Sequence, residues 1–583
     1  MASTSDLNKF MEKDRDLDLG RRRFTGRMSL AVKVLAILTS LYHLSYSVGV
    51  FSWFGVYLQL GTHRGISFSL IAALIFLLTP ALKRSPRHRV PWYDYLIIVL
   101  AAVPSIYFAV NYTALVYRSN MATLFEAWMG LVLLLVVLEG ARRVVGLILA
   151  IIGTVFLLYP FVSQFMPGLL YARAHSFTRI MEVMYFYPAG VFGGTYHIIA
   201  TTVIAYMIFG AFLQVSGAGK FFINLALALL GGVRGGPAKV AVASSAFFAS
   251  ISGSAVANVA STGVITIPMM KSIGYKPHFA GAVESVASNG GPLTPPVMAA
   301  VAFIIADFLG ITYLDVIIAA ALPAFLYYLA CFIMVDLEAA KTGLKGLPRE
   351  QLPSFGQVFK DGWPYFLPLV ILIYFLAVMR YSAETSSYYS IGAFILVSWF
   401  KKGTRLYPKD ILKALADGAT AMLSVVAAVG IAGILMAALE VTGLSLGLSG
   451  AIVNLFYGNK VGLLLMSAVF CLILGMGATT TAVYLLAAII VVPALTMVGI
   501  NPLVAHFFVF YMAQASMITP PICLVAYVAA SIAQTSFWKV GFTAVRLGIV
   551  ILILPFIFVY SPELLIVGSP GSVALAVVTA IMG

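Results

Sequence analysis

Residues that could bind a cation through neutral oxygen atoms gather in four short runs of this chain. Ser250–Asn258 and Gly475–Thr481 consist mainly of small and hydroxylated residues. Ser288–Pro296 has an asparagine as its second residue, and Gln514–Pro521 begins with a glutamine. Both runs end in Thr-Pro-Pro. Hydroxyl, amide and main-chain carbonyl oxygens suit a monovalent hard cation, whereas Mg²⁺ and Ca²⁺ usually recruit carboxylates as well. The four runs therefore predict binding of sodium ions.

The four runs form an internal repeat. Thr294 and Thr519 are 225 residues apart, and so are Pro268 and Pro493, the prolines that follow the two hydroxyl-rich runs. The same offset pairs Ser254 with Thr479 and Asn289 with Gln514. A constant offset at several landmarks predicts two structural repeats, an arrangement that is typical of secondary transporters.

The composition indicates a membrane protein. Of the 583 residues, 61% are hydrophobic and only 10% are charged, against about 25% charged residues in a typical soluble domain. The formal charge of +15 would suggest nucleic acid binding in a soluble protein, but in a membrane protein basic loops mark the cytoplasmic side. We therefore expect an all-α polytopic membrane protein that spans a lipid bilayer and has no nucleic-acid partner.

Loop charges predict the orientation of the chain. Residues 1–28 are polar and of mixed charge, which indicates a cytoplasmic tail. Four apolar segments follow within residues 29–140, and arginines and lysines cluster before the first, after the second and after the fourth. The N-terminus is therefore predicted to be cytoplasmic. Residues 141–583 are predicted to form a transporter domain with repeat one at about 190–336 and repeat two at about 410–560.

Apolar segments beside the runs are too short to cross a bilayer alone. Phe279–Ala287 and Val297–Ile305 fall short of the roughly 20 residues of a membrane helix, but joined through Ser288–Pro296 they have the right length. We therefore expect a broken helix in each repeat, with irregular backbone that faces protein or a wet cavity. Basic residues flank Ser250–Asn258 on both sides and nearly vanish around Gly475–Thr481, which predicts two re-entrant hairpins entering from opposite sides of the membrane.

Two further features concern the transported species. Glu284 lies inside an apolar segment and is a candidate proton site, although a hydrogen-bonded structural carboxyl explains it equally well. The half-helices after Pro296 and Pro521 would direct the positive ends of their dipoles into the site, where an anionic substrate group could bind.

The runs at 252–258 and 288–296 and the second Thr-Pro-Pro resemble the membrane component of tripartite ATP-independent periplasmic (TRAP) transporters. The resemblance is closest to the TAXI type, in which small and large membrane subunits are fused. It covers roughly residues 140–583 for the large subunit and is weaker for residues 1–140. It implies an elevator-type carrier of the bacterial inner membrane that takes up a small organic acid delivered by a periplasmic solute-binding protein. The implied coupling ion is sodium, with protons as the alternative, and no organic cofactor is implied.

Carried onto this sequence, the resemblance implies three groups of residues. The first cation site would consist of Ser254, Asn258, Asn289, Gly290 and Thr294. The second would consist of Thr479, Thr480, Gln514 and Thr519. Substrate would lie between them, near Ser252, Gly253, Thr481, Pro295 and Pro520.

Three rival interpretations exist. The first is a channel, although the sequence shows no ring of charged or repeated filter residues. A dicarboxylate/sodium carrier without a binding protein shares the hairpins and ion motifs, but four additional N-terminal spans favour the fused tripartite type. An intramembrane serine protease is a remote alternative, because Gly447–Gly450 fits Gly-x-Ser-Gly with Ser449 as nucleophile and His506 as base. We expect a transporter and not an enzyme.

Overall fold

The structure is a computed structural model that describes residues 21–82, 84–118, 120–456 and 459–582. Every regular element in these ranges is helical. Ten of the described helices are long and apolar enough to cross a membrane, or eleven if the bent pair Arg349–Tyr365 and Leu367–Ala377 counts as one span. The prediction of an all-α polytopic membrane protein is confirmed.

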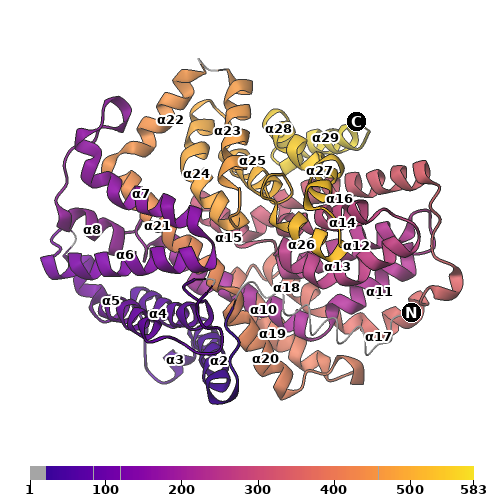
Figure 1. The fold of residues 1–583 in the computed structure, drawn as a ribbon, viewed down its shortest axis with the longest axis horizontal. Coiled ribbons are helices and arrows are strands. Elements are labelled where there is room, and N and C mark those ends of the chain that lie inside the picture. The colour runs from indigo at the N-terminus through magenta and orange to yellow at the C-terminus, as the bar shows by residue number, and fades with distance from the viewer. Residues whose placement is uncertain (1–20, 83, 119, 457–458, 583) are drawn as a thin grey trace. The chain divides into compact units, whose positions relative to one another are not determined.

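Contacts divide the described residues into two compact units. The first unit contains the described residues up to Val162, together with Ala174–Ala200 and Ala419–Val441. Its helices are α2 (Gly26–Val48), α3 (Val50–Trp53), α4 (Leu60–Leu78), α5 (Trp92–Tyr117), α6 (Leu124–Val144), α7 (Leu147–Val162), α8 (Phe177–Phe186), α9 (Gly194–Ile198) and most of α21 (Leu423–Thr442) (Figure 1). The four spans expected within 29–140 correspond to α2, α4, α5 and α6. The segment 171–189, which the sequence left unplaced, includes α8, whose buried face packs on α6.

The second unit contains Ser163–Arg173, Thr201–Gly418 and the described residues from Thr442 onward. Its helices before the second repeat are α10 (Ile204–Val215), α11 (Ala218–Leu230), α12 (Gly236–Ser252), α13 (Ala255–Ser272), α14 (Pro277–Asn289), α15 (Ala300–Leu309), α16 (Tyr313–Thr342), α17 (Phe355–Gly362), α18 (Leu367–Ala377), α19 (Ala383–Ser398) and most of α20 (Pro408–Ala421). From Thr442 onward its helices are α22 (Leu444–Leu455), α23 (Lys460–Leu474), α24 (Thr480–Met497), α25 (Pro502–Ala515), α26 (Leu524–Ala533), α27 (Phe537–Leu547), α28 (Val550–Tyr560) and α29 (Pro570–Met582).

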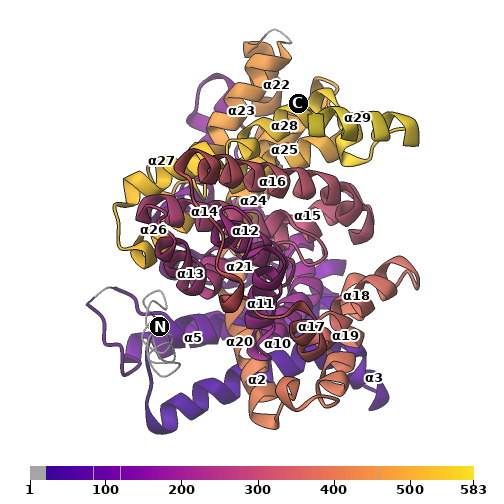
Figure 2. The same ribbon diagram turned by 90° about the vertical axis from the view of Figure 1, so that its right-hand side faces the viewer.

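Helix boundaries in the second unit confirm the internal repeat. Both ends of α24 lie 225 residues after the matching ends of α13, and α25 starts 225 residues after α14. Each repeat thus contains a helical hairpin, α12–α13 or α23–α24, followed by a broken helix, α14–α15 or α25–α26. Within this unit α13, α14 and α26 pack against one another (Figures 1 and 2).

The hairpin turns and helix breaks fall where the hydroxyl-rich and Thr-Pro-Pro runs predicted them. The first hairpin turns at Gly253, whose positive φ of 60° is accessible to glycine at little cost. A Cβ there would also lie 2.2 Å from the Met298 carbonyl oxygen, so only glycine lets the tip approach the first break this closely. The Pro295–Pro296 and Pro520–Pro521 peptide bonds, one in each break, are both cis.

Candidate functional site

The first hairpin tip lies against the first helix break. Ser254 caps α13, since its hydroxyl accepts a hydrogen bond from the Ala257 amide at 3.3 Å. Asn258, on the first turns of α13, is fully buried and donates from Nδ2 to the Ser245 carbonyl at 3.0 Å. A Cβ on Gly291 would lie 3.8 Å from that same Nδ2 atom. The amide of Asn258 is therefore held beside the main chain that the break exposes.

The second hairpin tip meets the second break in the same manner. Thr480, at the start of α24, donates from its hydroxyl to Gln514 Oε1 at 2.8 Å. A Cβ on Gly475 would collide with the Ser516 side chain, at 2.0 Å from its Oγ, which shows how closely the turn approaches the break. The hydroxyl of Thr479 is buried and has no hydrogen-bond partner among the described residues. It is therefore an orphaned polar group at a predicted cation ligand.

Thr294 and Thr519 have equivalent surroundings. Thr294 donates from Oγ1 to the Gly290 carbonyl at 2.7 Å, and Thr519 donates to the Ala515 carbonyl at 2.8 Å. Each hydroxyl thus donates its one hydrogen to the carbonyl four residues earlier. The oxygen lone pairs remain available, so both threonines can still act as cation ligands.

The two predicted cation sites meet at a junction between Asn289 and Gln514, the repeat-equivalent amides. Gln514 donates from Nε2 to the side-chain oxygen of Asn289 at 2.7 Å and to its main-chain oxygen at 2.9 Å. Asn289 donates from Nδ2 to the Gln514 carbonyl at 3.2 Å. Both residues are fully buried. The ends of α14 and α25 are therefore joined directly by hydrogen bonds.

Tyrosines of α16 bind main-chain carbonyls around the first break, a feature that sequence reasoning missed. Tyr327 donates to the Val286 carbonyl at 2.6 Å, and Tyr328 donates to the Ala287 carbonyl at 3.1 Å. Tyr313 donates to the carbonyls of Pro296 and Val297, at 2.8 and 2.7 Å. These hydrogen bonds hold the main chain on both sides of the first break in place. A cluster of tyrosines on one apolar helix was the available signal.

Glu284 is enclosed by hydroxyl groups from three helices. Thr262 of α13 and Ser288 of its own helix donate to Oε1, the latter at 3.1 Å. Thr266, one turn after Thr262, donates to Oε2 at 2.5 Å, and Ser245 of α12 donates to Oε1 at 3.2 Å. The carboxyl is fully buried and faces no cationic side chain in these contacts. The spacing of four residues within Thr262/Thr266 and Glu284/Ser288 could have revealed this cluster.

The residues predicted to bind substrate differ in exposure. Ser252, Gly253, Pro295 and Pro520 are half-buried, in keeping with a position at the rim of the tips and breaks. Thr481 is 7% exposed and lies inside α24, one residue beyond the hydroxyl that contacts Gln514. Four of these five residues are thus partly accessible, and their role in binding substrate stays a prediction.

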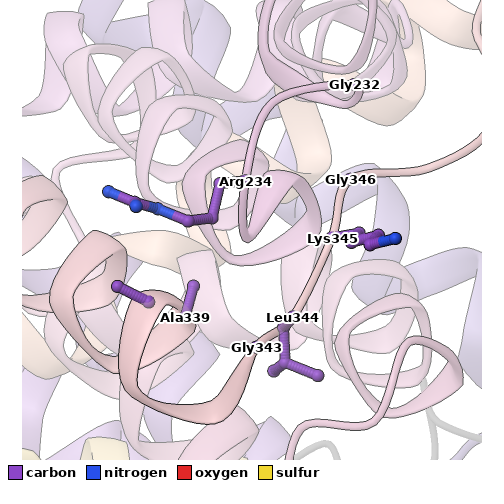
Figure 3. Close-up of a pocket in the computed structure, with 8 residues that line it drawn as sticks. Gly232, Arg234, Ala339, Gly343, Leu344, Lys345 and Gly346 are labelled. Carbon is purple, nitrogen blue, oxygen red and sulfur yellow. The ribbon is translucent and has the colours of Figure 1, made fainter.

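A separate cleft of about 390 Å³ lies where α16 ends and α12 begins (Figure 3). Glycine and alanine form most of its lining, with Arg234 and Lys345 as its charged members. Arg234 forms an ion pair with Asp336. None of the residues in the hairpin tips or breaks lines this cleft, so we assign no part of the transport site to it.

Two helical hairpins whose tips meet two broken helices define a secondary transporter. The profile of the tripartite ATP-independent periplasmic transporter, DctM component, matches residues 132–571, and the chain belongs to this family. Members of the family are solute-uptake permeases that work with a periplasmic solute-binding protein. The resemblance of the sequence to the large TRAP permease is thus confirmed.

Three relatives share a quarter of their aligned residues with this chain. The isethionate TRAP transporter permease protein DctMQ of Oleidesulfovibrio alaskensis is 25% identical over 73% of this chain and 63% of its own length, so the chain spans less than two thirds of that protein. The 2,3-diketo-L-gulonate TRAP transporter large permease protein YiaN of Escherichia coli is 25% identical over 62% of this chain and 84% of its own length. The C4-dicarboxylate TRAP transporter large permease protein DctM of Pseudomonas aeruginosa is 24% identical over 56% of this chain and 76% of its own length.

The family excludes the protease interpretation, and the geometry agrees. Ser449 donates to the Ser445 carbonyl of its own helix at 2.9 Å. His506 pairs with the hydroxyl of Tyr484 at 2.7 Å. The proposed nucleophile and base thus have other hydrogen-bond partners, and the interpretation as an intramembrane serine protease is wrong. The protein is a transporter permease and not an enzyme.

Replacing Asn289 and Gln514 by alanine tests the junction between the repeats. Because the two side chains form hydrogen bonds with each other, we expect the effects of N289A and Q514A on the free energy of unfolding to be non-additive, with a coupling free energy of about 1 kcal/mol or more. The measurement is the free energy of unfolding of both single variants and the double variant in mixed micelles. Asn501→Ala paired with Gln514→Ala is the control, since these residues are at opposite ends of α25, about 20 Å apart. Additive effects for Asn289 and Gln514 would contradict the junction.

Proposed function

We propose that this protein carries out secondary active uptake of a small organic anion, delivered by a periplasmic solute-binding protein and driven by a sodium gradient. Family membership supports uptake with a binding protein. Two relatives are named for isethionate and for C4-dicarboxylates, a sulfonate and carboxylates, which favours a small organic acid as the substrate. The proposed location is the bacterial inner membrane with the N-terminus in the cytoplasm, because basic loops follow that orientation.

The proposal of sodium coupling rests on the oxygen atoms of the predicted cation ligands at the two helix breaks. Thr294 and Thr519 have matching hydrogen bonds, and neither set contains a carboxylate or a basic side chain. Neutral oxygens in buried surroundings favour a monovalent cation, since an empty site made of carboxylates would be costly at membrane depth. The orphaned Thr479 hydroxyl gains a partner when a cation binds. Bound cations would then supply the positive charge that an anionic substrate needs.

The transport mechanism and the subtype belong to the same proposal. Lys239 and Lys271 flank the first hairpin, whereas Lys460 alone precedes the second tip, so we propose inverted hairpins and an elevator-type movement of the second unit's repeats. We also propose the fused TAXI type, in which residues 29–140 take the place of the small subunit. Three long helices, α2, α4 and α5, lie before the region of the family match and α6 begins before it, which supports this assignment.

Thr294→Val and Thr519→Val test the sodium sites. Valine keeps the shape of threonine and deletes one oxygen, and loss of such a group commonly costs about 1–3 kcal/mol. We therefore expect each variant to raise the sodium concentration for half-maximal uptake by roughly ten- to hundredfold. The measurement is uptake of a C4-dicarboxylate or of isethionate into proteoliposomes, with a periplasmic solute-binding protein for that compound and an imposed sodium gradient.

Thr154→Val is the matched control, because Thr154 lies outside the site and makes the same kind of bond, 2.8 Å to the carbonyl four residues earlier. It should leave the sodium dependence unchanged. Parental sodium dependence in both Thr294→Val and Thr519→Val, with normal folding and rate, would refute the assignment of these oxygens.

Coupling to protons is the second candidate function, and the buried Glu284 carboxyl is the observation that favours it. A carboxyl surrounded by four hydroxyls can exist in either protonation state, because hydroxyl groups both donate and accept. Glu284→Gln preserves size and hydrogen bonding but cannot exchange a proton. If protons drive transport, this variant should lose uptake driven by a pH gradient while keeping the parental melting temperature. Uptake that responds to pH identically in parent and variant would remove Glu284 from the coupling mechanism.

A further inference from the structure

The first unit carries a surface of exposed arginines at one end of its helices. Two segments form it: residues 21–27, which lead into α2, and residues 84–89, which lie between α4 and α5. Its exposed arginines are Arg23, Arg27, Arg84, Arg87 and Arg89. We call this set the arginine surface.

Hydrogen bonds hold the two segments together. The Arg23 amide donates to the Arg87 carbonyl at 2.8 Å. The buried Arg22 guanidinium donates to the Pro86 carbonyl at 3.3 Å and to the Phe76 carbonyl, at the end of α4, at 2.8 Å. These bonds hold the main chains of the two segments side by side, so the arginines of both segments share one surface.

Acidic side chains below this surface are already neutralised. Asp94, in the first turn of α5, is fully buried and forms ion pairs with both Arg22 and Arg143, the latter at 2.7 Å. Glu139 pairs with Arg142 at 2.7 Å and with Arg143 at 2.6 Å. Arg27, Arg84, Arg87 and Arg89 form no ion pair with any acid in the described ranges. Within the described residues, the charges of these four arginines are therefore not balanced by acidic partners.

Apolar side chains continue from the arginine surface along two helices. Leu30, in the first turns of α2, is 64% exposed, and Trp92, which opens α5, is 75% exposed. Further exposed apolar residues follow along the same helices: Val34, Leu38 and Leu41 on α2, and Leu96, Val99 and Val103 on α5. Tryptophan is enriched where a membrane helix meets the lipid headgroups. The arginine surface thus adjoins an apolar surface that is suited to acyl chains.

We propose that the arginine surface binds an anionic phospholipid, with the phosphate-bearing headgroup on the arginines and the acyl chains along α2 and α5. Arginine matches phosphate geometry with two parallel hydrogen bonds, and clustered basic residues beside a membrane helix attract anionic lipids. A zwitterionic lipid offers the same phosphate, but its amine would repel neighbouring arginines. The surface therefore selects a phospholipid with net negative charge, such as phosphatidylglycerol.

Native mass spectrometry of the full chain in detergent tests this proposal. With equimolar phosphatidylglycerol and phosphatidylcholine, the parent should retain phosphatidylglycerol selectively. Because each arginine near the surface contributes to the attraction, R84A/R87A/R89A should lower that selectivity by roughly tenfold. The matched control K341A/K345A/R349A removes three exposed basic residues from the end of α16 and the loop after it, and should keep the parental selectivity. Far-ultraviolet circular dichroism and size-exclusion chromatography establish that both variants are folded.

Equal retention of the two lipids by the folded parent would overturn the proposal, as would an equal loss of selectivity in the two triple variants. Residues 12–18 include the acids Glu12, Asp14, Asp16 and Asp18, which lie outside the described residues. Selectivity that emerges only when these four acids are replaced by their amides would assign the arginine surface to the chain's own N-terminal segment and contradict the lipid assignment.

Discussion

Irregular main chain inside a membrane protein must find partners for its amide and carbonyl groups, and the second unit is organised around that requirement. Each broken helix frees carbonyls at membrane depth, where an unsatisfied group costs several kcal/mol. Threonine hydroxyls, tyrosine hydroxyls and two side-chain amides provide those partners. The Asn289–Gln514 junction matters most among them, because it joins one break to the other. The site is thus assembled from groups that also hold the fold together.

The two repeats have the same order of helices, but different side chains form the hydrogen bonds at each helix break. Tyr327 and Tyr328 bond carbonyls at the end of α14, whereas the residues 225 positions later are the apolar Leu552 and Ile553. Glu284 has Val509 as its counterpart, and the Tyr484–His506 pair has Val259 and Gly281. The first half therefore has more hydrogen bonds at its break than the second. We expect the second hairpin to rearrange at lower free-energy cost, since fewer bonds oppose its movement.

Much of this architecture could be predicted from the sequence. The offset seen at Thr294 and Thr519 also sets the boundaries of α13 and α24, because the same local rules for proline and small residues act in both repeats. The contact between Asn289 and Gln514 could not be predicted, since equivalent residues touch only where a pseudo-two-fold axis passes between them. The tyrosines of α16 could be noticed in the sequence, but the partner of Tyr327 could not be identified, because the Val286 carbonyl, 41 residues away, carries no side-chain signature.

Direct binding of sodium to the purified protein tests the central claim most simply. Isothermal titration calorimetry with NaCl, against choline chloride at the same ionic strength, reports binding without a solute-binding protein or a substrate. The oxygen sets at Thr294 and Thr519 predict saturable heat with sodium, none with choline, and weaker binding after either threonine is replaced by valine. Identical heats with the two salts would contradict the account, because the hairpin tips and helix breaks would then hold no sodium.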